Sequence, residues 1–493
     1  MTSAALPGVS LTFERAASDD EPLRTDVAVF IGRTRRGPVG LPMRVESWND
    51  VVDLYGPPDG TSATPYALRG FFENDGRTAW VLRVSGLATP AASARWTDGH
   101  VFVARSPGAW ANGGRIIVRY QGSSVAGPPA VTVRVQVPGE PVETFAGLPP
   151  DGVAAGLAAS RLITLVTTVP GAPGPIPPGA PNSLVWDLTL TGGGDVPPGR
   201  TEYGAAVTAQ AELAEPALVS LPDLGADLAA ADHTDVVLSL LAECAPLLDR
   251  LVLLDVPPAR STVDDVLAWV GSLADLGDEA LLAAAAVYHP PLRAPELAGT
   301  GLRTVPASGH VAGLVAKLDG ERGAAHTPAN ATLLDAVDLE VEYPEPQQLR
   351  LFEANVDLVR CVRGRGLVVW GGRTLSGDPR RRYVAHRRLL HLLVRAVRRA
   401  AVPLVFEVNS PQLRLALVRA VTSVLLEAFR TGALAGSRPE DAFRVVCDET
   451  NNPPEQDPGQ VVCEIGVAPA VPMEFIRLRL VLGQDRGLEV IEQ

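Results

Sequence analysis

The chain has 493 residues, of which 46% are hydrophobic and 20% are charged, and its formal net charge is −13. This length exceeds one ordinary hydrophobic core, so we expect a globular protein of about two to four domains. The acidic balance argues against general nucleic-acid binding, and no apolar run reaches the roughly 18 to 20 residues of a membrane span.

The start of the chain has the pattern of a short strand followed by a linker. Val9, Leu11 and Phe13 alternate with polar residues, and the polar, acidic stretch 16–26 follows them. We therefore assign residues 1–26 to an N-terminal arm and linker. Residues 1–30 lack a basic start followed by an apolar run, so no signal peptide is expected.

The next part of the chain alternates predicted strands and helices. Within 27–97 we expect a buried strand at 27–32, helices at 47–55 and 66–74, and a strand at 78–84. Within 205–330 we expect helices at 235–248 and 262–276 and strands at 250–255 and 280–288. The β-α-β order implies parallel pairing, so 27–97 and 205–330 together predict an outer α/β domain. Between them, Gly/Pro-rich loops and apolar alternation predict a β-rich insertion over 98–204.

The last third predicts a compact α+β domain over 331–474. It contains a strand at 366–370, a long helix at about 380–400, a strand at 404–407 and a second long helix. Ser410 and Pro411 have the residue types of an N-cap and first helical position, and Gly432 follows the last turn of that helix.

Residues 475–493 read as a C-terminal arm. Ile476, Leu478 and Leu480 alternate with arginines, and Leu488 and Val490 belong to a second short strand. No obvious partner for these strands follows in the chain. We expect them to pair with a strand of another copy, the one that carries Val9, Leu11 and Phe13.

Residues that could support chemistry are few. No phosphate-binding loop of the type G-x-x-x-x-G-K-[ST] occurs, and the thiols Cys244, Cys361, Cys447 and Cys463 have no metal-ligand spacing. We expect no cofactor, no metal and reduced cysteines in a cytosolic protein. Asp448 and Glu449 indicate a hydrogen-bonded turn rather than a calcium loop.

The best enzyme hypothesis rests on Asp255, which ends an apolar strand. The carboxyl ends of parallel strands are where α/β enzymes place catalytic groups. His289 closes a neighbouring strand and could approach Asp255. The plainer interpretation is that Asp255 bonds a nearby backbone amide and His289 ends its strand before two prolines.

A basic helix face is the more specific charge pattern. Residues 379–400 contain eight arginines, two histidines and no acid. Four of these side chains share one face of the helix, Arg387, His391, Arg395 and Arg398. Like charges at this spacing repel by a few tenths of a kcal/mol each, so an acidic partner surface is expected, with an ordinary solvated face as the alternative.

The chain resembles the sheath proteins of contractile phage tails and related contractile injection systems. The similar segments follow one another in the order of that family: PASGHVAG at 306–313, DGERG at 319–323, PAN at 328–330, Asn355, GRG at 364–366, VWGGRTL at 369–375, RYV at 382–384, Arg387 and Arg388, FEVN at 406–409, and the segments 442–453 and 468–476. Shorter similarities occur at 7–9 and 106–112. Gly372 and Val408 depart from the residues usual in the family, and residues 120–230 are poorly matched.

The resemblance implies a structural protein, not an enzyme, that polymerises helically around an inner tube and contracts to drive it through a target envelope. It implies an inner α+β domain with strand-donating arms and an outer α/β domain carrying the insertion. The implied partners are other copies or paralogues of the chain, the inner tube protein, and baseplate and cap proteins, without nucleic acid or membrane insertion. Assembly is expected in a bacterial cytoplasm, and the basic helix face becomes a candidate tube contact. An enzyme centred on Asp255 and a non-contractile, capsid-like assembly protein remain the alternatives.

Overall fold

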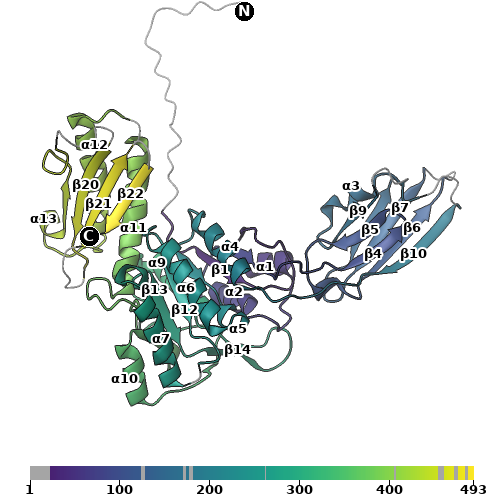
Figure 1. Ribbon diagram of the computed structural model, residues 1–493, viewed down its shortest axis with the longest axis horizontal. Helices are drawn as coiled ribbons and strands as arrows, with labels where there is room; N and C mark the ends of the chain where they lie inside the picture. The colour runs from purple at the N-terminus through teal and green to yellow at the C-terminus, as the bar shows by residue number, and fades with distance from the viewer. Residues whose placement is uncertain are drawn as a thin grey trace, which may run out of the picture.

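The computed structural model describes residues 23–123, 128–169, 174–176, 181–260, 262–404, 407–453, 460–470, 476–483 and 487–492, the last two as backbone. Three parts are visible in Figure 1: a central α/β body, a β lobe that projects from it, and a C-terminal unit on the opposite side of the body. Among the described residues, no helix has the length and apolarity needed to span a membrane.

An eight-stranded sheet forms the centre of the body. Its order is β18 (Gly366–Trp370), β17 (Val356–Val362), β13 (Ala285–His289), β12 (Leu251–Asp255), β11 (Leu218–Ser220), β1 (Ala28–Gly32), β3 (Ala79–Arg83) and β2 (Met43–Val45). The six inner strands are parallel, and the two edge strands are antiparallel to their neighbours. The predicted α/β character is confirmed.

Helices cover both faces of this sheet, as a parallel sheet requires. One face carries α4 (Arg200–Ala211), α6 (Ala230–Cys244) and α7 (Val263–Leu276), and the other carries α1 (Trp48–Tyr55), α2 (Thr64–Glu73) and α9 (Ser308–Arg322). Ser47 and Thr262 cap α1 and α7 through their side chains. Shorter elements complete the body: α5 (Leu224–Asp227), α8 (Glu279–Leu282), α10 (Glu345–Glu353), and a small sheet of β15 (Leu302–Val305), β14 (Leu292–Pro295) and β16 (Asp338–Leu339).

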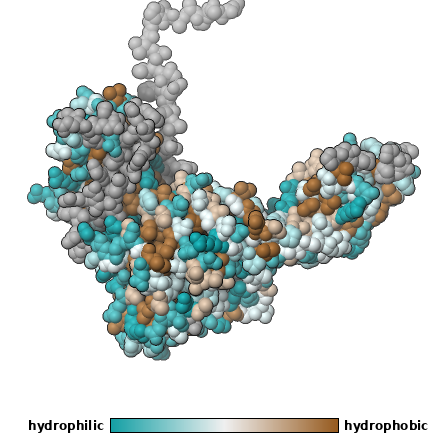
Figure 2. All heavy atoms as spheres, viewed as in Figure 1, coloured by the Kyte–Doolittle hydropathy of each residue, from teal (hydrophilic) through white to brown (hydrophobic). Residues whose placement is uncertain are grey.

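The projecting lobe consists of two antiparallel sheets around a core of its own. They are β4 (Ser93–Thr97), β5 (His100–Ala104) and β9 (Ile163–Thr167) in one sheet, and β10 (Ser183–Thr189), β6 (Arg115–Gln121), β7 (Ala130–Gln136) and β8 (Glu143–Leu148) in the other. The lobe begins at Ser93, within the segment 27–97 that we assigned to the α/β domain. On the face drawn in Figure 2, hydrophobic side chains lie in small groups among polar ones, over both the lobe and the body.

The C-terminal unit contains two long helices and an antiparallel sheet. The helices are α11 (Val384–Ala401) and α12 (Pro411–Arg430), and the sheet has the order β19 (Phe443–Val446), β20 (Gln460–Val467), β21 (Ile476–Gly483) and β22 (Gly487–Glu492). The Ser410 hydroxyl accepts a hydrogen bond from Leu413 N, so the predicted cap of α12 is confirmed. The strand expected at 404–407 is wrong at its start, where Leu404 ends a 3₁₀ turn; residues 405–406 lie outside the described residues.

The boundary of the C-terminal unit differs from the predicted one. We assigned all of 331–474 to this unit, but β17 pairs with β13 along the register Val287↔Val356, and β18 pairs with β17. Both strands therefore extend the large sheet. Their apolar pattern gave no sign of which sheet they join, because pairing partners lie far apart in the sequence.

Candidate functional site

The sheet of the C-terminal unit packs against its two helices through one hydrophobic cluster. Leu393 and Val397 of α11 and Leu417 and Val421 of α12 share this cluster with Ile465 of β20. The apolar faces of both helices therefore cover the sheet. The unit is held together by its own core, separate from the two clusters of the large sheet.

The terminal strands have a partner within the chain, and the expectation that they lack one is wrong. β21 pairs with β20 over its full length, from Gln460↔Gly483 to Val467↔Ile476, and β22 pairs with β21. This pairing is possible because β21 occupies the edge of β20 opposite to the one that β19 occupies. The predicted arm residues Ile476, Leu478, Leu480, Leu488 and Val490 all lie on this hairpin.

The outer edge of β22 is the last edge of this sheet. In the described part of the chain, β22 pairs with β21 alone, which leaves the main-chain groups of its other side without a strand partner. Such an edge accepts a strand from another chain. The proposed donor residues Val9, Leu11 and Phe13 lie outside the described residues.

The basic face of α11 is buried, so the prediction of a solvent-facing surface for the tube is wrong. Arg387 and His391 are 3% and 2% exposed. Arg395 and Arg398 point into the junction with the large sheet, where they contact main-chain and side-chain oxygens of the body. Burial, and then the neighbouring arginines, lower the pKa of His391 well below its usual value, which keeps the imidazole neutral at pH 7.

Arg395 makes the densest set of contacts in this junction. Its guanidinium donates to the carbonyl oxygens of Arg24 at 3.1 Å, Glu215 at 2.9 Å and Asp249 at 3.0 Å, and to that of Pro216. These residues precede β1, β11 and β12, so one side chain bridges the amino ends of three adjacent strands. Burial lowers the pKa of Arg395 to about 10, and the guanidinium stays charged at neutral pH.

Two further arginines of α11 extend the junction. Arg388 donates to Thr25 O at 2.7 Å and pairs with the buried carboxylate of Asp319 on α9, while Arg398 lies 3.6 Å from the Asp249 carboxylate. The acidic partners that α11 lacks in its own sequence are therefore Asp319 and Asp249 of the same chain, so these two arginines need no acidic partner protein. The contacts with Arg24 and Thr25 also hold the start of the first described segment against α11.

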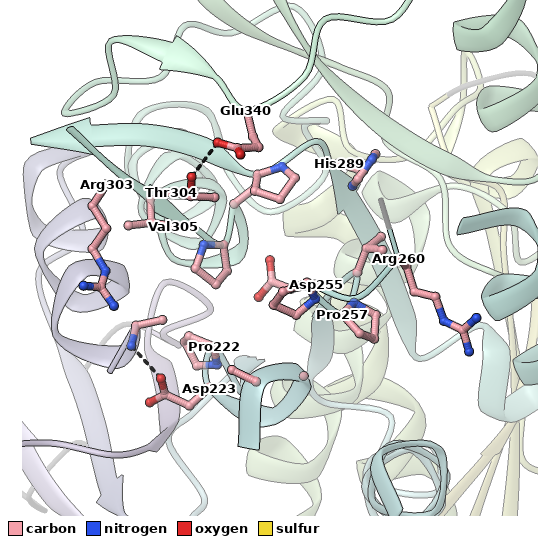
Figure 3. Close-up of a pocket in the computed structure, with 18 of the residues that line it drawn as sticks. Pro222, Asp223, Asp255, Pro257, Arg260, His289, Arg303, Thr304, Val305 and Glu340 are labelled. Carbon is pink, nitrogen blue, oxygen red and sulfur yellow. Dashed lines mark hydrogen bonds between the residues drawn. The ribbon is translucent and has the colours of Figure 1, made fainter. Parts of the chain in front are cut away.

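Asp255 and His289 line one cavity, as neighbouring strand ends should. The cavity has a volume of about 400 Å³ and opens at the carboxyl ends of β11, β12 and β13. Figure 3 shows the Asp255 carboxylate facing the cavity and the Arg260 side chain pointing away from it. This is the crevice in which open α/β sheets bind ligands.

Both side chains are engaged in structural contacts. Asp255 accepts hydrogen bonds from Ser308 N at 3.0 Å and from the Ser308 hydroxyl, at the first turn of α9, as the plainer interpretation expected. His289 Nε2 lies 2.8 Å from the Tyr343 hydroxyl. No hydrogen bond joins Asp255 to His289 among the described residues. The cavity therefore gives no support to an acid–base pair.

The pH dependence of stability tests the state of Asp255. Burial raises its pKa to about 7, against the lowering effect of the Ser308 hydrogen bonds, whereas an Asp in an unfolded chain titrates near about 3.9. The folded state thus holds the proton to higher pH, and this stabilising contribution is lost as pH rises through about 7.

We expect Asp255→Asn, which cannot ionise, to gain about 1–3 kcal/mol of unfolding free energy relative to the wild type between pH 5 and pH 8. Urea titrations at several pH values measure this difference. Asp98→Asn, whose side chain is 96% exposed in the wild type, is the matched control and should show no such trend. A difference for Asp255→Asn that does not vary with pH contradicts the prediction.

The Asp448–Glu449 segment forms a local turn. The Asp448 carboxylate accepts from Thr450 N at 2.8 Å and from the Thr450 hydroxyl, and Asn451 donates to Val446 O. Within the described ranges no group of three or more His, Cys, Asp or Glu side chains is arranged to hold a metal ion. The interpretation as a hydrogen-bonded turn is confirmed.

Sequence comparison identifies two domains in the second half of the chain. Residues 268–375 match the phage tail sheath protein central domain, and residues 376–483 match the phage tail sheath C-terminal domain. The boundary between them lies between β18, which is the last strand of the large sheet along the chain, and the start of α11. The similarity to sheath proteins predicted from the sequence is confirmed.

Individual relatives agree with this result. The tail sheath protein of Enterobacteria phage T4 is 29% identical over 184 residues, which are 36% of this chain and 27% of that protein. That of Vibrio phage KVP40 is 31% identical over 36% of this chain and 26% of its own length. The chain thus spans about a quarter of the length of these curated relatives.

Solved structures match nearly the whole fold. The sheath tail protein of Desulfitobacterium hafniense has a TM-score of 0.65 at 15% identity and covers 97% of this chain and 100% of its own. The helical sheath of the anti-feeding prophage in its contracted state has a TM-score of 0.58 at 22% identity, covering 96% and 98%. The chain shares their mixed α and β fold.

Proposed function

We propose that this chain, which carries the central and C-terminal domains of the phage tail sheath family, is a structural subunit that polymerises as a helical sheath around an inner tube and contracts. The observation that carries the proposal is the match of residues 268–483 to both sheath domains in order. No step of the proposal requires catalysis, a cofactor or a metal.

Strand addition supplies the linkage between subunits in this proposal. The free edge of β22 accepts main-chain hydrogen bonds from residues 9–13 of another copy. Each such bond contributes about 0.5–1.5 kcal/mol net, so the several bonds made by one added strand hold neighbouring subunits together. In this proposal the part of the predicted linker that precedes the anchored Arg24 allows the connection to persist while the bodies of the subunits rotate.

The junction at α11 is the second part of the proposal. Arg388 and Arg395 bind the carbonyls of Thr25 and Arg24, so a pull on the N-terminal arm is transmitted to α11 and to the amino ends of three strands. In this proposal, the N-terminal arm is attached at the same junction through which α11 of the C-terminal unit contacts the body. Contraction then moves each body without breaking the linked arms, with its energy stored in the lattice at assembly.

The partners follow from this role. They are further copies or paralogues of the chain, together with an inner tube protein, a baseplate and a cap. These partners assemble in a bacterial cytoplasm into a phage tail or tail-like particle. Structures similar in fold include a chain of the anti-feeding prophage baseplate and chains of contracted sheaths. The surface that meets the tube is not the buried basic face of α11.

Electron microscopy of the purified chain tests the proposal directly. We expect hollow, striated cylinders of fixed diameter in negative stain, alone or with the tube protein. Closed shells instead of cylinders would identify the capsid-like alternative. A uniform monomer at high concentration and in the presence of the tube would contradict the proposal.

A further inference from the structure

Two cysteines face one another across the first two strands of the C-terminal sheet. β19 pairs with β20 in the register Phe443↔Val467 to Val446↔Glu464. Continuing this antiparallel register by one residue places Cys447 opposite Cys463. Both are free thiols in the same hydrophobic cluster, 8% and 0% exposed.

The hydrogen-bonding pattern shows which kind of cross-strand pair they form. Ala468 N donates to Ala442 O at 2.8 Å, which makes that opposed pair a hydrogen-bonded one. Hydrogen-bonded and non-hydrogen-bonded pairs alternate along antiparallel strands, so Cys447 and Cys463 form a non-hydrogen-bonded pair. In such pairs the Cα atoms lie roughly 4.5 Å apart, within the roughly 4.4–6.8 Å that a disulfide requires.

The side chains point toward each other. Each thiol has its largest electrostatic influence on the other, which lowers the pKa of Cys447 and raises that of Cys463. Arg414 also favours the Cys447 thiolate, and Asn452 Nδ2 lies 4.0 Å from the Cys447 sulfur. Cys447 is therefore the nucleophile of the pair, and the fully buried Cys463 is the thiol that would resolve a mixed disulfide on it.

We propose that Cys447 and Cys463 are a redox pair that closes into a disulfide when the protein meets a small-molecule disulfide, joining β19 to β20. The inference is independent of the proposed function, because it concerns the subunit alone. The other two thiols are different in kind: Cys244 is buried on α6 beside Gln210, and Cys361 is exposed on β17.

The reaction is a pair of thiol–disulfide exchanges. The Cys447 thiolate attacks one sulfur of the small disulfide, whose S–S bond breaks and releases one small thiolate. Cys463 then gives up its proton, and its sulfur attacks the Cys447 sulfur of the mixed disulfide, releasing the second small thiolate. The two cysteines together lose two electrons and two protons, and the small disulfide gains both as two thiols.

The bond would change how the sheet resists opening. β20 is the strand on which β21 pairs, and β22 follows β21, so the whole terminal hairpin depends on β20 staying in place. In the thiol form, β20 is held to β19 by four opposed residue pairs and their side-chain packing. A covalent link at the end of this ladder restricts the unfolded state of the segment that it closes.

The test is disulfide mapping of the full chain with oxidised glutathione as the probe. We expect peptides containing Cys447 and Cys463 to be linked in non-reducing digests, and the link to disappear with dithiothreitol. The apparent thermal transition should rise by several degrees on oxidation and return on reduction. Cys361→Ser is the background for all samples, since it removes the exposed thiol that would join two chains.

Single-cysteine variants test whether Cys447 and Cys463 react as a pair or independently of each other. Cys463→Ser should retain glutathione as a stable mixed disulfide on Cys447, because the resolving thiol is gone. Cys447→Ser should leave Cys463 unmodified, since it is buried and has lost its partner. Full alkylation of both cysteines in denatured, glutathione-treated Cys361→Ser protein, or a persistent mixed disulfide on Cys447 in that protein, would overturn the proposal.

Discussion

Replacing Arg395 by methionine should destabilise the protein by about 3–5 kcal/mol, the range for removing one partner from a buried, charged network. Methionine preserves much of the side-chain length but donates no hydrogen bonds. The carbonyl oxygens of Arg24, Glu215, Pro216 and Asp249 would then be left in the junction without this donor. Because these carbonyls lie at the amino ends of three neighbouring strands, the substitution should destabilise both the large sheet and its contact with the C-terminal unit.

Urea denaturation followed by circular dichroism measures the effect. Arg430→Met on the adjacent helix α12 is the matched control, because the Arg430 side chain is 72% exposed and pairs weakly with Glu427. It should change the unfolding free energy by no more than about 0.5 kcal/mol. Arg395→Lys should lie between the two, since a lysine keeps the charge but not the planar fork of donors. Equal stabilities for Arg395→Met and Arg430→Met would show that the junction contributes little.

Deleting residues 1–14 should abolish stable sheath formation and leave a folded monomer. The deletion removes the strand that we propose adds to the edge of β22 in another copy, and with it several main-chain hydrogen bonds at each contact. The body should stay folded, because described residues from Val27 onward already form two extensive hydrophobic cores on the faces of its sheet. Sedimentation and negative-stain microscopy measure assembly, and circular dichroism measures folding.

Point variants within the arm provide the matched control. Aspartate at Val9, Leu11 and Phe13 places three charges on the apolar side of the strand and should prevent assembly as the deletion does. Aspartate at Ser10 and Thr12 changes the polar side of the same strand and should be tolerated. Polymer at the wild-type yield from the deletion variant would show that this arm donates no strand.

Local signals in the sequence determined much of the fold. Ser410 and Pro411 predicted the start of α12, because a cap and the first helical turn depend on neighbours in the chain. The strand that ends at Asp255 and the helix that follows it were likewise predicted from residues that are neighbours in the chain. Similarity to sheath proteins was also readable, since its motifs occur in order over a long span.

Contacts between distant residues decided the rest. The basic face of α11 has the pattern of a surface in sequence, but its partners are carbonyls at Arg24, Glu215 and Asp249, which no periodicity of the helix reveals. The terminal strands looked unpaired because β20, the partner of β21, precedes them in the chain instead of following them. Sequence therefore determined many of the elements and the similarity to sheath proteins. Only the tertiary structure decided which faces are buried, because burial depends on what packs from elsewhere in the chain.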